Sequence, residues 1–303
     1  MTMFRAFKPV DLLSIAFISI LAAVTLAALP RLPHGGWLLA RYAALIVALV
    51  FAARSASSRD APNSAVMLHA FLPVFIVPVL FDSMGDLIPW IWPRFFDDLL
   101  IRADYSLFGG RHPTVLLERF IHPALTTVLQ FAYISYYPMA VVLGVVLYAK
   151  KRQKQFNEAI FGVILCFYLS YLGYLIFPAV GPRFTLAHLQ TRDLAAGPLV
   201  LAIQNTLNAL ENTKTDAFPS GHTAVALMTL YYAVKAKERV LTVLLLPAVT
   251  GLILSTVYLR YHYVVDVIAG VALTVLTAVL APPLYAWASR LAGDAGDQFH
   301  HPS

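Results

Sequence analysis

The chain has 303 residues, of which 59% are hydrophobic and 13% charged, and its mean hydropathy is +0.72. Soluble domains are nearer half apolar and a quarter charged, so this composition excludes a soluble globular protein. The net charge of +6 comes from basic residues scattered over short segments, which argues against a nucleic-acid partner and fits a protein that lies among anionic lipid headgroups. The single cysteine, Cys166, lies inside an apolar run, so no intramolecular disulfide forms and we interpret it as a core residue.

Apolar runs of about 20 residues recur along the chain, which indicates an all-α, polytopic helical membrane protein. The first run follows Arg5 and Lys8, but no small-residue cleavage site comes after it, so we interpret it as a retained helix rather than a signal peptide. Pro73 and Pro78 fall within the third run, where each is expected to kink the axis. We expect about eight membrane-spanning helices, near residues 10–29, 37–53, 64–81, 123–148, 157–177, 219–234, 240–257 and 261–289.

Two stretches differ in character from these runs. Residues 82–122 mix aromatic side chains with Asp and Arg, which predicts either a partly helical segment in the membrane interface or an extramembrane loop. Residues 178–217 form a long polar loop, whose middle, 198–210, is expected to be a short helix. We therefore divide the chain into N-terminal transmembrane helices (1–81), an interfacial segment (82–122), a second helix bundle that carries the candidate chemistry (123–290) and a polar tail (291–303).

The basic residues between the spans predict the orientation in the membrane. With eight spans and both termini on one side, the dense basic runs Lys150–Lys154 and Lys235–Arg239 fall on that same side. The positive-inside rule assigns this side to the cytoplasm. Arg183, His222 and His262 are then expected on the extracytoplasmic face, which is the periplasm or the exterior if the membrane is a bacterial inner membrane.

The first candidate site is Pro219-Ser220-Gly221-His222, where a polar loop becomes an apolar helix. The first amides of a helix lack intrahelical partners and carry the positive end of the dipole, so they form an anion site. Gly221 allows a phosphate to approach the backbone, Ser220 offers a hydroxyl donor, and His222 is placed to give a proton to a leaving oxygen. The alternative is an ordinary helix cap followed by an interfacial histidine.

The second candidate is the pair His262 and Asp266, four residues apart. On a helix the two side chains differ by about 40° and share a face. A carboxylate one turn from an imidazole holds its tautomer and raises the basicity of the far nitrogen, so the histidine can attack phosphorus. The alternatives are a structural His–Asp pair between helices and a metal site, although no further Cys, His or Glu completes a set at metal spacing.

The third candidate is Arg183, just after the fifth span, in the sequence Gly181-Pro182-Arg183-Phe184. The guanidinium fork suits the oxygens of a phosphate. The alternative is an interfacial arginine that faces lipid headgroups. If the three candidates belong to one site, Arg183, His222 and His262 should converge in one pocket, with Asp266 close to His262.

Together these segments resemble the type 2 phosphatidic acid phosphatase superfamily, whose motifs are Lys-x6-Arg-Pro, Pro-Ser-Gly-His and Ser-Arg-x5-His-x3-Asp. The resemblance covers roughly the second half of the chain. The second motif is complete at Pro219–His222, and the third keeps Ser255, His262 and Asp266 in register. The resemblance implies that His262 is the nucleophile that forms a phosphohistidine and that Asp266 orients it. It further implies that His222 is the general acid and that Arg183 and Ser220 bind phosphate.

The chain departs from two of these motifs. The lysine of the first would fall at Ile176, with the Arg-Pro order reversed at Pro182-Arg183, and the arginine of the third would fall at Thr256. Arg260 is a candidate replacement for phosphate binding. On a continuous helix it would point about 160° away from His262, so it reaches the phosphate only if the chain bends before it or another helix wraps around it.

The missing cations suit a phosphate of lower charge, such as a phosphodiester. In this respect the chain is similar to the inositol phosphorylceramide synthase branch, in which a phosphoinositol headgroup moves from a phospholipid to a ceramide-type acceptor. We therefore expect a membrane enzyme without metal or cofactor that cleaves a phospholipid or polyprenyl phosphate ester. Headgroup transfer is favoured over simple hydrolysis of phosphatidic acid or a polyprenyl phosphate. The non-enzyme alternative is a transporter or structural membrane protein.

Overall fold

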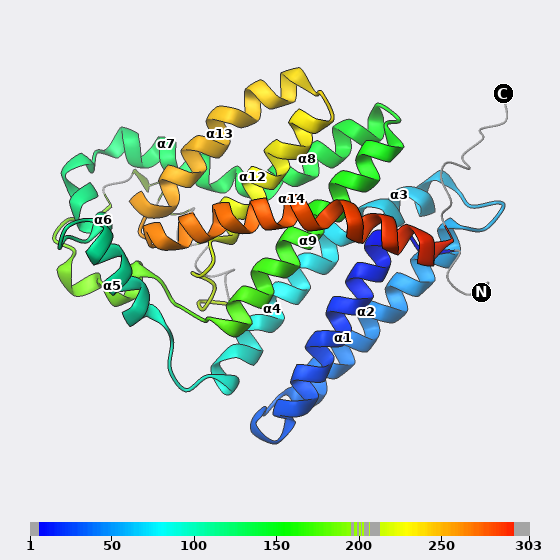
Figure 1. The fold of residues 1–303 in the computed structure, drawn as a ribbon, viewed down its shortest axis with the longest axis horizontal. Coiled ribbons are helices and arrows are strands. Elements are labelled where there is room, and N and C mark those ends of the chain that lie inside the picture. Colours follow the sequence, from blue (N-terminus) through cyan, green and yellow to red (C-terminus); the bar gives the residue numbers. More distant parts are fainter. Residues whose placement is uncertain are drawn as a thin grey trace.

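The computed structural model describes residues 6–194 and 213–293, with residues 197, 198, 200, 202 and 206 between them. This part of the chain consists of helices and connecting loops, and its β-structure is an isolated parallel bridge between Ala179 and Asp216. The α-helices, labelled in Figure 1 except for the short α10, are α1 Pro9–Ala28, α2 Gly35–Ala56, α3 Asn63–Phe71, α4 Pro73–Ile91, α5 Asp97–Leu107, α6 Pro113–Leu116, α7 Pro123–Ile134, α8 Tyr136–Ala149, α9 Gln153–Ile176, α10 Pro182–Thr185, α12 Gly221–Lys235, α13 Arg239–Tyr258 and α14 Val264–Ala292. Three 3-10 segments lie at Leu29–Arg31, Leu117–Phe120 and Ala187–Leu189.

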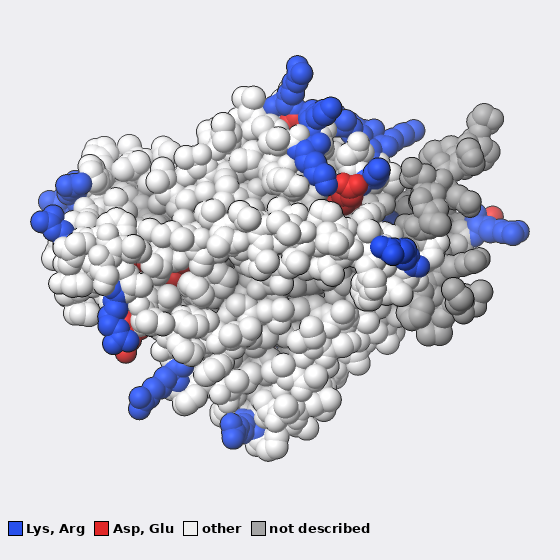
Figure 2. Space-filling view, in the orientation of Figure 1, with Lys and Arg blue, Asp and Glu red and all other residues white. Residues whose placement is uncertain are grey.

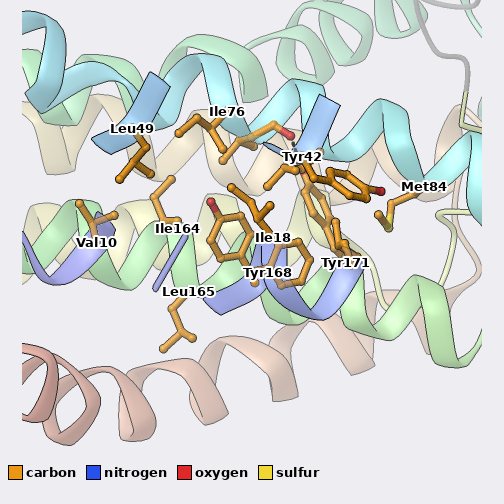
Figure 3. Close-up of a cluster of buried hydrophobic side chains, with 14 of the residues drawn as sticks. Val10, Ile18, Tyr42, Leu49, Ile76, Met84, Ile164, Leu165, Tyr168 and Tyr171 are labelled. Carbon is orange, nitrogen blue, oxygen red and sulfur yellow. Dashed lines mark hydrogen bonds between the residues drawn. The ribbon is translucent and has the colours of Figure 1, made fainter. Parts of the chain in front are cut away.

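Of the first four helices, α1 and α4 pack on the central helix α9, α2 packs on α1, and α3 packs on α2 and α4. Their shared core joins side chains of α1, α2, α4 and α9, as the close-up in Figure 3 shows. The ring of Phe17 stacks on Tyr168 at 4.3 Å between centroids, and the Tyr168 hydroxyl donates to Ser14 Oγ at 3.0 Å. This unit therefore supports α9, whose other face belongs to the second bundle.

The second bundle surrounds α12, which packs against α8, α9, α13 and α14. Its core is made of buried apolar side chains, among them Leu143, Cys166 and Met228. The start of α12 lies against α14 at Gly270, where a Cβ would stand 2.6 Å from the Ser220 carbonyl oxygen. Only glycine allows this approach without displacement, so the packing of α14 fixes where α12 begins.

Six helices of the described chain are long and apolar enough to cross a membrane, counting Asn63–Ile91 as one, or seven if the bent pair α7 and α8 is one span. The polytopic helical fold is confirmed, but the count of eight is not. The sixth expected span is the 15-residue helix α12, which is shorter than the other candidates. The fourth expected span is divided at Ser135, where α7 and α8 meet at an angle of 46°.

The expected boundaries differ from the structure in two places. α4 continues past residue 81 to Ile91, so the segment 82–122 begins as helix and only then forms α5 and α6. The last helix begins at Val264 rather than at 261, which leaves His262 outside it. The short helix expected at 198–210 falls largely outside the described residues, as does the tail from residue 294 onward.

The densest group of charged side chains in the view of Figure 2 lies at one end of the second bundle, over the turns that join α8 to α9 and α12 to α13. There Glu238 pairs with Lys150 and Arg152, and Lys235 pairs with Glu158. A broad surface without charge separates this end from α5 and α6 at the opposite end. Such a band is expected where a helical bundle faces the hydrocarbon of a bilayer.

Candidate active site

His222 lies in the first turn of α12, two residues after Ser220, which caps this helix. The Ser220 hydroxyl accepts a hydrogen bond from the Thr223 amide at 3.3 Å, which is the usual N-cap interaction. The imidazole of His222 is stacked on Tyr133 and tilted against Tyr136, at 4.8 and 4.4 Å between ring centroids. These two rings come from either side of the break between α7 and α8, so this break shapes the wall behind His222.

His262 is carried by the short turn between α13 and α14. The carbonyl of Thr256 accepts hydrogen bonds from the amides of Tyr261 and His262, at 2.9 and 3.0 Å, and so closes the turn. Asp266 lies in the first turn of α14, where its carboxylate accepts from the Tyr263 amide at 2.8 Å. His262 and Asp266 are therefore neighbours through the start of a helix, not along one helical face.

The hydrogen bonds around His262 assign its tautomer. Nδ1 lies 2.8 Å from the carbonyl oxygen of Ala217 and 3.5 Å from Oδ2 of Asp266. A carbonyl oxygen only accepts, so Nδ1 carries the proton and Nε2 of the neutral ring carries the lone pair. Nε2 lies 3.3 Å from Nδ1 of His222, which then acts as the donor. The basic nitrogen of His262 thus points at His222.

The two histidines line a pocket of about 130 Å³ together with Arg183. Arg183 belongs to the short helix α10, which follows Gly181 at φ +89°, and its guanidinium lies 5.6 Å from the centre of the Tyr261 ring. The three residues expected to converge therefore share one cavity. Asp266 lies behind His262, fully buried.

The pocket also contains two charged residues to which sequence reasoning gave no role, Lys214 and Asp216. Burial raises the pKa of the Asp216 carboxyl to about 6, against the opposing influence of His262. Asp216 is held in place because the amide of the next residue, Ala217, donates to the carbonyl of Ala179 at 3.0 Å. The sequence feature that could have indicated a role for Asp216 is a carboxylate at the edge of an apolar helix, shortly before the Ser-Gly-His segment.

Comparison with known proteins identifies the family. The sequence profile of the PAP2 superfamily matches residues 98–280. The chain belongs to the PAP2 superfamily. It is 28% identical over 219 residues to a PA-phosphatase related-family protein of Dictyostelium discoideum, a match that covers 65% of this chain and 38% of that protein. It is 26% identical over 195 residues to a phosphoinositol dihydroceramide synthase of Bacteroides thetaiotaomicron, covering 58% of this chain and 64% of that one. No solved structure matches the chain.

PAP2 membership makes this chain a membrane protein of a phosphatase and phosphotransferase superfamily, and the expected resemblance is confirmed. The chain spans 38% and 64% of the lengths of these two relatives. At the two positions where the motifs predicted a cation, this PAP2 protein has none. Ile176 is 65% exposed at the end of α9, and the Thr256 hydroxyl donates to a carbonyl of its own helix at 2.7 Å.

Arg260 is not among the residues that line the pocket. Its guanidinium pairs with Glu118 at 2.8 Å and also donates to Gln190 and to the carbonyl of Arg192, at 3.0 and 2.6 Å. Burial acts to raise the pKa of the Glu118 carboxyl, but the hydrogen bonds of Thr191 and the charge of Arg260 together lower it. The structure thus gives Arg260 an ion pair with the segment 82–122 instead of the phosphate contact expected from the sequence.

Ser220 and Gly221 also lie beside the pocket rather than in its lining. The Ser220 hydroxyl is turned into α12, where it donates to the Thr223 hydroxyl at 3.1 Å, and its amide donates to the carbonyl of Asp266 at 3.0 Å. Gly221 faces the hydroxyl of Tyr174. Both residues fix the start of α12, and with it the place of His222.

Helix α5 holds the two loops of the site together, although the sequence suggested only an interfacial segment. Asp97 is buried and accepts from the amides of Val180 and Gly181, at 3.0 and 2.9 Å, and from the Tyr263 hydroxyl at 2.9 Å. Two turns further on, Asp104 caps α14 by accepting from the amides of its first two residues, Val264 and Val265, both at 2.9 Å. The loop of Arg183 and the turn of His262 are therefore bound to one helix.

Proposed function

We propose that this PAP2 protein is a lipid phosphotransferase that works through a phosphohistidine on His262. The observation that carries the proposal is the pair of hydrogen-bonded rings, with Nδ1 of His262 held by the Ala217 carbonyl and Nε2 directed at His222 inside a pocket with Arg183. An anchored imidazole whose Nε2 is unprotonated is the form that attacks phosphorus. Asp266 supports the positive charge that the ring gains when the bond forms.

The proposed first half-reaction places the substrate phosphate between the two rings. Nε2 of His262 attacks phosphorus, the bond from phosphorus to the lipid oxygen breaks, and His222, protonated on both nitrogens, gives a proton to that oxygen. In the second half-reaction an acceptor hydroxyl loses its proton to His222 while its oxygen attacks phosphorus, and the electron pair of the P–N bond returns to His262. Arg183 and Lys214 balance the charge of the phosphoryl oxygens.

The charge of the pocket favours a phosphodiester over a terminal phosphate monoester. Arg183 and Lys214 are offset in part by Asp216, while positions 176 and 256 carry no cation. A diester brings one negative charge and a monoester up to two, so the weaker field suits the diester. Together with the relative named phosphoinositol dihydroceramide synthase, this supports transfer of an inositol-phosphate-like headgroup to a lipid alcohol.

Hydrolysis is the second candidate, favoured by the likeness to a PA-phosphatase related-family protein. The two reactions share the phosphohistidine and differ in the acceptor, which is water for a phosphatase. The basic runs at the far end of the bundle support an active site on the extracytoplasmic face, as in the periplasm of a bacterial inner membrane.

The test uses the purified protein in vesicles with headgroup-labelled phosphatidylinositol, with and without ceramide. We expect label on the protein in an acid-labile, base-stable form, and transfer to ceramide faster than release to water. His262→Ala should abolish both the protein-bound label and turnover. His188→Ala is the matched control, because His188 is exposed on the same side of the bundle and outside the pocket. Turnover that persists in His262→Ala would refute the phosphohistidine. Preferential release of free phosphate from phosphatidic acid or a polyprenyl phosphate would favour the phosphatase.

A further inference from the structure

A second cavity, of about 200 Å³, begins at the active-site pocket and runs between α4, α8 and α9. Its walls are almost entirely apolar and include Val77 of α4, Gly144 of α8 and Ile160 of α9. Asp216 and His222 belong to the lining of both cavities. The apolar groove therefore ends at the groups of the proposed reaction.

The groove exists because α4 and α8 diverge from each other where both pack on α9. Both α4 and α8 pack against α9, but within the described chain they are not among the helix pairs in extensive contact with each other. α4 follows the break at Pro73, and α8 follows the 46° bend after α7. Pro78 and Tyr137, which line the groove, are exposed on the outer surface of α4 and α8. The groove thus opens between spanning helices, where lipid chains lie.

The cations of the site line only one of the two cavities. Arg183 and Lys214 line the polar pocket alone, whereas Asp216 lines both cavities and is the charged residue in the lining of the groove. A carboxylate repels the oxygens of a phosphate and accepts a hydrogen bond from a neutral hydroxyl. A phosphate is therefore favoured in the polar pocket, and an apolar chain that ends in a hydroxyl is favoured in the groove.

We propose that the groove binds the alkyl chain of the lipid alcohol that accepts the phosphoryl headgroup, and that the Asp216 carboxylate accepts a hydrogen bond from its hydroxyl. This inference rests on the proposed phosphotransferase function. After the first half-reaction the headgroup stays on His262 in the polar pocket, so the acceptor must approach phosphorus from the side opposite Nε2. That is the side of His222, which the groove reaches.

The roles of Asp216 and His222 toward this alcohol differ. Asp216 orients the hydroxyl oxygen toward phosphorus. His222 takes the proton as the O–P bond forms and the P–N bond breaks, so the electron pair returns to His262 and no further reactant is needed. Asp216 acts as a specificity determinant that favours a neutral alcohol at the end of an alkyl chain.

The experiment compares transfer to ceramides with acyl chains of six and sixteen carbons, alongside the labelled phosphohistidine. Ala140 of α8 lines the groove, and Ala140→Phe should lower the preference for the longer acceptor by at least about tenfold, because the filled groove no longer buries several methylenes. Val142→Phe is the matched control, since Val142 lies on the same helix, is 42% exposed and lies outside the groove. It should keep the wild-type preference.

Asp216→Asn should lower transfer to ceramide, relative to release to water, by about tenfold, because the amide replaces a charged acceptor by a weaker one. An unchanged chain preference in Ala140→Phe, or an unchanged ratio of transfer to hydrolysis in Asp216→Asn, would overturn this inference even if the phosphohistidine forms. If the wild-type protein forms no phosphohistidine, the proposed function fails instead.

Discussion

Replacing Asp97 by Ala is expected to uncouple the two loops of the active site while leaving every residue of the pocket in the chain. The carboxylate is 6% exposed and accepts three hydrogen bonds, from the amides of Val180 and Gly181 and from the Tyr263 hydroxyl. Each donor left without a partner in a buried site costs about 1–2 kcal/mol, so the three together weaken the native arrangement by roughly 3–6 kcal/mol.

Part of this loss is recovered if the loops move apart and water reaches the donors. Arg183 then leaves its place opposite His262, and the competent arrangement becomes the minor one. If about half of the loss, about 1.5–3 kcal/mol, remains as a bias against the competent arrangement, its population falls by roughly ten- to one-hundredfold, because each 1.4 kcal/mol corresponds to a factor of ten. We therefore expect Asp97→Ala to lower kcat/KM for headgroup transfer by about one to two orders of magnitude.

The assay is the vesicle transfer reaction, with thermal unfolding in detergent measured on the same preparations. Asp98→Ala is the matched control, because Asp98 is the adjacent residue of the same type and is exposed. It should keep wild-type turnover within about twofold, as surface substitutions usually do. An Asp97→Ala protein that is folded and as active as Asp98→Ala would refute the view that α5 positions the site.

Three further predictions concern other residues of the site and its orientation. Arg260→Ala leaves the buried Glu118 without its cation and should lower Tm. Adding Glu118→Gln to this variant should restore part of the lost Tm. An unchanged Tm with a raised KM would instead place Arg260 on the phosphate. Folding raises the pKa of Asp216 from 3.8 to about 6, so the folded state binds this proton more tightly and the contribution of Asp216 to stability falls as pH rises through this range. Asp216→Asn should therefore have a higher Tm than the wild type at about pH 7.5 and a similar Tm near pH 4, and an equal difference at both pH values would contradict the shift. A cysteine at the exposed His188 should react with an impermeant maleimide from outside intact cells and one at Arg239 should not, whereas the reverse pattern would invert the orientation.

The helical fold could be predicted from the sequence because a spanning helix is specified by its own composition. Apolar runs of about 20 residues need no knowledge of their neighbours. The break between α7 and α8 was missed, although Pro138 gave a signal for it. Proline lacks the amide that would bond to Ile134 four residues earlier, and its ring clashes with that carbonyl. Ile134 is the residue at which α7 ends.

The convergence of Arg183, His222 and His262 was also within reach of the sequence, because each residue lies where a polar loop meets an apolar helix. The contribution of α5 was not. Asp97 and Asp104 have no helical periodicity that marks them as ligands of distant amides, and their partners lie 83 and 160 residues away in the chain. Such contacts depend on how the bundle closes, which local pattern does not encode.

Arg260 illustrates how a correct geometric argument can lead to an incomplete expectation. A continuous helix would have turned the Arg260 side chain away from His262, so a phosphate contact required a bend in the chain near Arg260. The structure has that bend, because α13 ends at Tyr258 and Arg260 adopts φ +67°. The bend, however, aims His262 at the pocket. Left-handed backbone at a residue other than glycine costs about 1 kcal/mol or more. The ion pair with Glu118 joins Arg260 to the segment 82–122 and so fixes the turn that carries His262.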